Sequence, residues 1–298
     1  MMHALILCEN HEWRVTSDVP MRAVQAGLLA LGHKATVLAP GVWPITDCVP
    51  DVVFVWNGFK GWRGQCVQQF GGMGVPVIIM ERAFFDRHKY TQFDHAGFNH
   101  AASWGAHLHE PAPPEGKARL EAAWGTPRPI AKRDGYLLAL LQTVGDAQLR
   151  GVELAHPAVL AKAIDVAAPD MLIRLRAHPL FPWDVGKPTR CEMIRGTLAD
   201  AVSGARFVVT CNSNAGNEAL AMGCPVLAVG PSLYGIAGVA RTATPATLEA
   251  ELQTMADGWL PDEGARDNYL HWLASRQWSA AEIADGECLK ALLDAATA

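Results

Sequence analysis

Short apolar runs recur along the beginning of the chain, each five or six residues long and each followed by polar residues or glycine. Continuous runs of this length are typical of strands that are buried on both faces of a sheet. Amphipathic helical stretches lie between them, and strands that alternate with helices favour parallel βαβ units. The expected strands are residues 4–8, 35–39, 51–56 and 75–80, and the expected helices are residues 19–31 and 62–70.

The same alternation restarts after residue 135. Strands are expected at residues 136–141, 171–176, 206–210 and 225–229. Helices are expected at residues 157–167, 191–203 and 214–222, and three helical segments near 245–257, 263–275 and 279–296 close the chain.

Between the two series, residues 84–133 show no clear period and are rich in His, Trp and Pro. We interpret the first part as a loop that carries a site, and residues 111–133 as the approach to a domain crossing. The sequence therefore predicts an α/β protein of two Rossmann-like, doubly wound domains, residues 1–130 and 131–298, with a C-terminal helical tail.

Composition fits a folded chain and narrows its setting. Half of the 298 residues are apolar, and no apolar run approaches the roughly 18 residues that span a bilayer. The net charge of −5 offers no basic excess for binding nucleic acid regardless of sequence. The seven cysteines form no Cys-x-x-Cys pair, so neither a disulfide framework nor a zinc ribbon is expected. No basic segment or cleavage site accompanies the apolar start, and we expect a cytoplasmic protein.

Familiar nucleotide and metal signatures are absent. The Gly-Lys pair at 186–187 is followed by Pro188, which excludes a P-loop, and no Gly-x-Gly-x-x-Gly follows the first strand. A His-Glu pair at 11–12 begins a zincin motif, but Val15 stands in place of its second histidine. There is no Asp-x-Asp to hold Mg²⁺ against a diphosphate. We therefore expect neither a metal nor another cofactor.

The strongest candidate site begins where the strand at 206–210 ends and a helix starts at once. A helix N-terminus presents backbone N–H groups and a partial positive charge, which suit a phosphate. Ser213 can cap the helix and donate its hydroxyl to the anion, and Glu218 can accept from ribose hydroxyls. An ordinary N-cap, with Glu218 only favouring the helix dipole, is the alternative. The nucleotide-sugar-binding candidates here are Asn212, Ser213, Asn214, Gly216, Asn217 and Glu218.

Two further candidates, Arg176 and His178, lie at the carboxyl end of the strand at 171–176. Neighbouring parallel strands would bring His178 near Ser213, where positive side chains can neutralise a phosphate or a leaving group. The alternative is a histidine whose hydrogen bonds are satisfied ahead of a turn at Pro179.

In the first domain, Glu81 follows the strand at 75–80 and is placed to act as a general base toward an interdomain cleft. An ion pair with Arg82 or Arg87 is the alternative. His11 lies just beyond the first strand, so it could be the base instead.

The segment at 84–90 interleaves aromatic and basic residues and would suit a nucleobase or a sugar acceptor by stacking and hydrogen bonding. Its candidate acceptor-binding residues are Arg87, His88 and Tyr90. The same segment could instead anchor a packed loop.

These motifs resemble the capsule-polysaccharide-synthesis glycosyltransferases of the bacterial β-Kdo-transferase type, which have two Rossmann-like domains of the GT-B class. The resemblance covers about residues 75–235 and is best in the second half. It implies that His178 and Ser213 hold the phosphate of the donor nucleotide. The family's acidic residue in the first domain is followed by acid-Gly-Phe, whereas Glu81 is followed by Arg82-Ala83-Phe84. The resemblance is carried by four motifs: residues 136–141 with Gln142 and Asp146, Arg176-Ala177-His178-Pro179, residues 212–216 with Glu218-Ala219-Leu220, and Gly223-Cys224-Pro225-Val226.

The residues and the resemblance together predict a metal-independent glycosyltransferase that moves a sugar from a nucleotide-sugar donor to a hydroxyl acceptor. The acceptor is a glycan or, since compact relatives of this kind occur among phage enzymes that modify DNA, a modified DNA base in the host cytoplasm. Two other functions stay open: a nucleotide-sugar 2-epimerase, and a non-catalytic protein that binds a sugar or a nucleotide.

Overall fold

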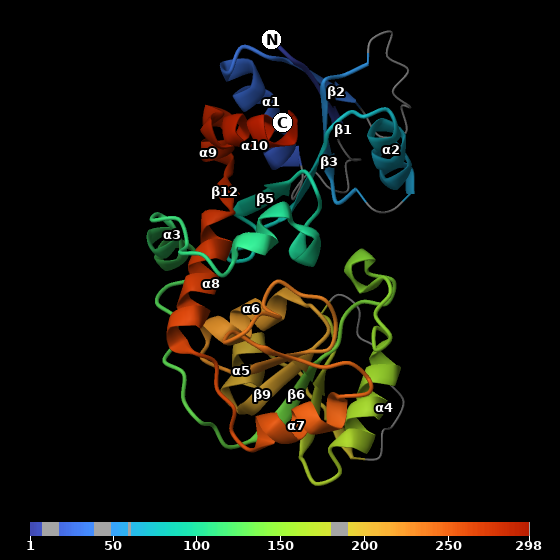
Figure 1. Cartoon of the computed structure of the whole chain (residues 1–298), viewed down its shortest axis with the longest axis vertical. Coiled ribbons are helices and arrows are strands. Elements are labelled where there is room, and N and C mark those ends of the chain that lie inside the picture. The colour runs from blue at the N-terminus through green and yellow to red at the C-terminus, as the bar shows by residue number, and fades with distance from the viewer. Residues whose placement is uncertain (8–17, 39–48, 59–60, 180–189, 298) are drawn as a thin grey trace. The chain divides into compact units, whose positions relative to one another are not determined.

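The computed structural model describes residues 1–7, 18–38, 49–58, 61–179 and 190–297 (Figure 1). The chain divides into two compact units, and each is built on one six-stranded sheet. The first unit comprises Met1–His107 with Leu273–Ala298, and the second comprises Leu108–Trp272. The predicted class, two Rossmann-like α/β units with a helical C-terminus, is confirmed.

The first sheet has the strand order β12-β5-β4-β3-β1-β2, and its four strands from β4 to β2 are parallel. Strands β5 and β12 continue it in antiparallel pairings. The six strands are β1 (His3–Leu7), β2 (Lys34–Leu38), β3 (Val52–Trp56), β4 (Val77–Arg82), β5 (Tyr90–Asp94) and β12 (Trp278–Ser279).

Helices cover both faces of this sheet. Alternate residues of its buried strands point to opposite faces, and both sets are apolar and pack against helices. Ile6 and Phe54 pack with α1 (Asp18–Ala30), α9 (Ala280–Asp285) and α10 (Glu287–Thr297) on one face. Leu5 and Val53 pack with α2 (Gly61–Gly72) on the other. Figure 1 shows α1, α9 and α10 on the side of the sheet opposite α2.

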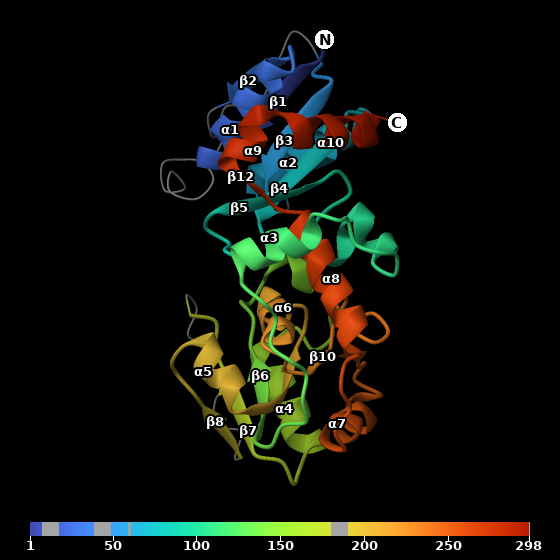
Figure 2. The same ribbon diagram turned by 90° about the vertical axis from the view of Figure 1, so that its left-hand side faces the viewer.

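The second sheet is wholly parallel, with the order β11-β10-β9-β6-β7-β8. In Figure 2 its strands β6, β7 and β8 fan out side by side. The strands are β6 (Tyr136–Leu140), β7 (Ile173–Arg176), β8 (Cys191–Met193), β9 (Ala205–Thr210), β10 (Val226–Ala228) and β11 (Arg241–Thr242).

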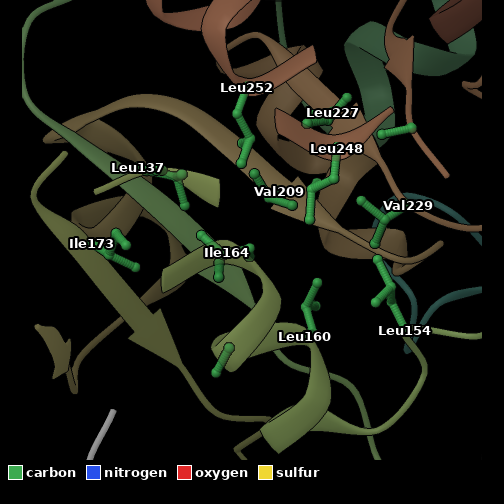
Figure 3. Close-up of a cluster of buried hydrophobic side chains, with 14 of the residues drawn as sticks. Leu137, Leu154, Leu160, Ile164, Ile173, Val209, Leu227, Val229, Leu248 and Leu252 are labelled. Atoms are coloured by element: carbon green, nitrogen blue, oxygen red, sulfur yellow. The ribbon is translucent and has the colours of Figure 1, made fainter. Parts of the chain in front are cut away.

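One face of the second sheet packs against α4 (Pro157–Ala167) and α7 (Leu248–Ala256), as Figure 3 shows. Leu137 and Val209 from the sheet meet Ile164 of α4 and Leu252 of α7 in one apolar cluster. The short helix α6 (Asn214–Ala221) packs on β9 and β10, and α5 (Leu198–Ser203) packs on β9. The long helix α8 (Glu263–Ser275) lies in the stretch where the second unit passes into the first.

The helix predicted at residues 191–203 is wrong, because this stretch contains β8 and then α5. Gly196 interrupts it with a φ of 108°, a left-handed conformation that ends regular pairing. Thr197 then starts α5 through a capping box with Asp200. Within residues 84–133, where the sequence shows no period, the structure has β5, two 3₁₀ turns (Asn99–Ala101 and Ser103–His107) and α3 (Gly116–Ala123).

The boundary between the two compact units does not lie between residues 130 and 131. Helices α9 and α10 bury Ile283 and Leu289 in the core of the first sheet, so the end of the chain belongs to the first unit. Residues 108–130 belong to the second unit, where Asn268 of α8 binds the backbone of Glu110 and Ala112. Within the described ranges, no helix combines the length and the apolar character that a membrane-spanning segment requires.

Candidate functional site

The polar residues predicted to bind the donor follow the carboxyl ends of the strands in the second sheet. In the register of that sheet, Leu140 of β6 is paired with Arg176 of β7 on one side and with Thr210 of β9 on the other. Thr210 is in turn paired with Ala228 of β10. The residues after these strands therefore leave the sheet at one edge, which we call the donor edge. Open α/β sheets bind their ligands at such an edge.

His178 and Ser213 do not follow neighbouring strands, and the expectation that they would was wrong in that respect. Strand β6 lies between β7 and β9, so the two strands are about 10 Å apart at the usual spacing. Gln142, which follows β6, occupies the intervening part of the donor edge. A ligand that contacts both Ser213 and His178 has to extend across β6.

Asn212 is buried and holds the donor edge together. Its backbone N–H donates to Oε1 of Gln142 at 2.9 Å, and its Oδ1 accepts from Nε2 of the same glutamine at 2.9 Å. Its Nδ2 donates to the backbone oxygens of Gln148 at 2.7 Å and Pro231 at 3.0 Å. With 1% of its surface exposed, Asn212 joins the loops after β6, β9 and β10. Its geometry is that of a residue that positions others.

Ser213 is the N-cap of α6, as the sequence predicts. Its Oγ accepts from the N–H of Ala215 at 3.2 Å, and its backbone oxygen accepts from the N–H of Gly216 at 2.9 Å. The hydroxyl of Tyr234 donates to the same backbone oxygen at 3.3 Å. Ser213 is half-buried at the start of the helix. A phosphate at this point would meet the N-terminal end of the α6 dipole.

Gly216 is required by packing against Tyr234. A Cβ at this position would lie 2.8 Å from the tyrosine ring, closer than carbon atoms approach one another. Gly216 is thus the residue that lets the buried Tyr234 lie against the first turn of α6.

Glu218 belongs to a hydrogen-bonded group on α6. Nδ2 of Asn214 donates to its Oε1 at 3.2 Å, and Oδ1 of Asn214 accepts from Nδ2 of Asn217 at 3.1 Å. Asn217 is 3% exposed, whereas Asn214 and Glu218 are half-buried. Asn217 therefore supports the site from within, and Asn214 and Glu218 form its accessible side.

Arg176 and His178 are half-buried on the other side of Gln142. Arg176 donates to the backbone oxygen of Gly196 at 3.2 Å. Arg174 of the same motif is used structurally, because it pairs with Glu192 at 3.1 Å and lies over the ring of Tyr136.

Two ionisable groups near the donor edge, Cys211 and Tyr234, carry no charge at neutral pH. Burial raises the pKa of the Cys211 thiol to about 12 and raises that of the Tyr234 hydroxyl well above its usual range, so both groups stay neutral near pH 7. Arg176, His178 and Glu218 are the ionisable side chains that the sequence analysis assigned to this edge. Among the described residues, no three His, Cys, Asp or Glu side chains form a group that could hold a metal ion.

In the first unit, Glu81 lies at the carboxyl end of β4 and is half-buried. Its Oε2 accepts from Nδ2 of Asn57 at 2.8 Å, and its Oε1 accepts from the backbone N–H of Arg82 at 2.8 Å. Asn57 has a left-handed φ of 65° in the turn after the adjacent strand β3. Arg87 uses its Nε on the backbone oxygen of Ala83, at 3.0 Å. His11, the other candidate base, lies outside the described residues.

Two aromatic residues of the predicted acceptor segment are packed inside the first unit. Phe84 and Phe85 are 3% and 1% exposed, and their backbone N–H groups donate to Oε1 of the buried Gln277. They anchor the segment and cannot stack on an acceptor. His88 is exposed and Arg87 and Tyr90 are half-buried, so their assignment to the acceptor stays a prediction.

The sequence analysis missed three buried side chains that hold α6 in place: Tyr234, Tyr269 and Arg266. Nη1 of Arg266 donates to the backbone oxygen of Leu220, at the end of α6, at 3.0 Å. The hydroxyl of Tyr269 donates to Oδ1 of Asn217 at 2.7 Å. A buried tyrosine needs a hydrogen-bond partner for its hydroxyl, so Tyr234 and Tyr269 could have been considered as structural residues. Nothing in the sequence indicates that Arg266 is buried, with 1% of its surface exposed.

Comparison with known proteins identifies a family and several proteins that this chain is similar to. The family model described as "Capsule polysaccharide biosynthesis protein" matches residues 80–260. The FixF protein of Sinorhizobium fredii is 35% identical over 111 residues, which are 35% of this chain and 27% of that protein. The chain thus matches about a quarter of that relative's length.

Two solved structures share the fold. They are structures of KpsC from Thermosulfurimonas dismutans, described as a β-Kdo 2,4 transferase and a β-Kdo 2,7 transferase, and both are 15% identical to this chain with a TM-score of 0.58. The first similarity covers 91% of this chain and 89% of the other, and the second covers 97% and 99%.

Proposed function

This chain belongs to the capsule polysaccharide biosynthesis family, and from that premise we propose that it is a metal-independent glycosyltransferase that uses a nucleotide-sugar donor and a hydroxyl acceptor. The observation that carries the proposal is the donor edge, where the capped N-terminus of α6 and the side chains of Arg176 and His178 lie at the carboxyl ends of strands of one parallel sheet. The KpsC structures that share the fold are transferases by their titles.

The donor phosphate is assigned to the start of α6. Ser213 already uses its Oγ as the acceptor for Ala215 N–H, so its hydroxyl hydrogen is directed elsewhere and can be donated to a phosphate oxygen. Arg176 supplies positive charge as the bond to the leaving phosphate breaks, and His178 donates a hydrogen bond to that phosphate. Glu218 accepts from the ribose hydroxyls.

The acceptor is assigned to the first unit, with Glu81 as the general base. The acceptor oxygen attacks the anomeric carbon, its proton passes to the Glu81 carboxylate, and the nucleotide leaves with the electron pair of the broken carbon–oxygen bond. Asn57 and the Arg82 N–H hold the two carboxylate oxygens in a fixed plane. His11 is the alternative base.

We propose a glycan as the acceptor. Phe84 and Phe85 are unavailable for stacking on a base, and the net charge of −5 opposes binding to duplex DNA. A modified DNA base is the competing acceptor, and Arg87, His88 and Tyr90 would contact either one.

Product analysis tests the proposal. The chain is incubated with CMP-, UDP-, GDP- and dTDP-linked sugars and a set of oligosaccharides and hydroxymethylated DNA, and free nucleotide and products are quantified. We expect free nucleotide from one donor, a glycan product, and a loss of at least about 100-fold in rate for Glu81→Gln, the usual size of a general-base contribution. The exposed Glu115→Gln is the matched control and should keep full activity.

Results other than these identify a different function or a different base. A changed sugar with no free nucleotide identifies a 2-epimerase, and binding without turnover identifies a binding protein. Full activity in Glu81→Gln removes Glu81 as the base and leaves His11.

A further inference from the structure

Helix α8 reaches the candidate ribose-binding carboxylate through a chain of three hydrogen bonds, which we call the Tyr269 relay. The hydroxyl of Tyr269 donates to Oδ1 of Asn217 at 2.7 Å, and Nδ2 of Asn217 donates to Oδ1 of Asn214 at 3.1 Å. Nδ2 of Asn214 then donates to Oε1 of Glu218 at 3.2 Å. All the donors point the same way, from the interior of the second unit toward its donor edge.

At its buried end the relay begins with a hydroxyl donor. Tyr269 is 0% exposed, and burial raises its pKa well above the usual range, so its hydroxyl keeps its proton. This hydroxyl donates to the oxygen of the Asn217 amide, and the NH₂ group of that amide is turned toward Asn214. Asn214 must then present its oxygen to Asn217 and its NH₂ group to Glu218. Each amide is thereby fixed in one of its two orientations.

The consequence concerns the carboxylate. If the Asn214 amide turned over, its oxygen would face Oε1 of Glu218, and two acceptors at hydrogen-bond distance repel each other. The hydrogen bond from Asn214 to Glu218 would then be lost. The relay holds the carboxylate where it stands beside the start of α6, before any ligand binds, and such preorganisation raises affinity.

We infer that Tyr269 is a positioning residue for the ribose of the donor nucleotide, acting through Asn217 and Asn214 on Glu218. The inference rests on the proposed function, because it takes Glu218 to bind ribose hydroxyls. Arg266 fixes the other end of α6 at Leu220 independently, so the loss of the Tyr269 hydroxyl leaves the helix in place.

The variant Tyr269→Phe tests the relay, since it deletes one oxygen and keeps the buried ring. Its matched control is Tyr136→Phe, which deletes another buried hydroxyl of the same unit, bound to the backbone oxygen of Ala201 at 2.6 Å. Tyr136 begins β6, at the end of the sheet opposite the donor edge. Titration calorimetry measures binding of CMP, UDP, GDP and ADP, and of their 2′,3′-dideoxy counterparts, to wild type, both variants, Glu218→Ala and the double variant Glu218→Ala/Tyr269→Phe.

We expect wild type to prefer one ribonucleotide over its dideoxy form. In Tyr269→Phe that preference should fall about fivefold, the worth of one hydrogen bond of about 1 kcal/mol, with binding of the dideoxy form unchanged. Tyr136→Phe should keep the full preference. In Glu218→Ala the added Tyr269→Phe change should have no further effect, because both act on the same contact.

Four results would overturn the inference. An unchanged preference in Tyr269→Phe means that the relay does not orient Glu218, and an equal loss for both nucleotide forms means that Tyr269 is only structural. A wild type with no preference removes Glu218 from the ribose and leaves the donor site standing. A wild type that binds no ribonucleotide instead removes the proposed donor site, and the relay's role with it.

Discussion

Gln142 and Asn212 bind each other twice, once through side chain and backbone and once through both side chains, with both distances at 2.9 Å. The pair joins the ends of β6 and β9 at the point where α6 begins. Asn212 continues the connection to the loop after β10 by way of Pro231. The position of the helix start relative to the rest of the donor edge is therefore set by a buried amide pair.

Replacing Gln142 by alanine should destabilise the second unit. The change removes both hydrogen bonds between Gln142 and the buried Asn212, and loss of the partner of a buried polar group costs about 1 to 3 kcal/mol. We expect the free energy of unfolding in urea to fall by about 2 to 4 kcal/mol. Gln253→Ala, which removes an exposed amide bound to Asp257 on α7, should change it by less than about 0.5 kcal/mol. Equal effects of the two variants would refute a structural role of the pair.

Gly216→Ala should lower both stability and nucleotide affinity. The added Cβ collides with the ring of Tyr234, and overpacking of this kind costs about 1 to 3 kcal/mol. Gly71→Ala is the control, since its Cβ would meet nothing within 4 Å. It lies near the end of α2 and should be neutral or slightly stabilising. Unfolding curves and nucleotide titrations of both variants decide whether the close approach at Gly216 matters.

Leu289→Ala should destabilise the first unit although it lies at the far end of the sequence. Leu289 of α10 is 0% exposed in the core cluster of the first sheet, and truncation of a buried leucine costs about 2 to 5 kcal/mol. Hydrogen exchange should show faster exchange of the amides in β1 and β3. Leu29→Ala, at a leucine of α1 that is 56% exposed, should leave them protected. Protected strands in the Leu289 variant would mean that α10 is not part of this core.

Stability should fall as the pH rises above 9. Burial raises the folded-state pKa of Cys211 to about 12 and that of Cys224 to about 11, from an ordinary value of 9.0. The folded chain keeps protons that the unfolded chain loses, so the contribution is complete below pH 9 and is lost as the pH approaches the folded values. Each thiol adds a slope of up to about 1.4 kcal/mol per pH unit. The double variant Cys211→Ala/Cys224→Ala should give a shallower slope between pH 9 and 10, below the range of the buried tyrosines, and an unaltered slope would count against this account.

The sequence predicts those elements of the fold whose signal is a continuous apolar run. Helix α4 has the predicted bounds of 157–167, and β6 and β9 lie within one residue of theirs. Strand β5 escaped notice because its buried positions include Thr91, Gln92 and Asp94, which give no apolar pattern. Its buried polar side chains form hydrogen bonds within the fold. Asp94, for example, accepts from the backbone N–H groups of Ala96 and Ser103.

Candidate site residues were found by their place after strands, and their roles depend on packing that the sequence does not express. Ser213 was identified as a cap from its position between a strand and a helix. Gly216 was assigned to the ligand, yet its own contact is with Tyr234, 18 positions further along. Asn212 and Asn217 are buried, and their partners Gln142 and Tyr269 come from distant segments, which the sequence does not reveal.

The most direct test of the donor edge is a thermal-shift panel with CMP, UDP, GDP, ADP and dTDP, with and without Mg²⁺, on wild type, Ser213→Ala and Ser279→Ala. Both variants lose an N-cap worth about 1 kcal/mol, and Ser279 caps α9 in the first unit. A nucleotide at about 100 times its dissociation constant stabilises the fold by roughly 2.7 kcal/mol, which is measurable. The account predicts a shift with one pyrimidine nucleotide that is independent of Mg²⁺, is lost in Ser213→Ala and persists in Ser279→Ala. No shift with any nucleotide, or a shift that survives in Ser213→Ala, would contradict it.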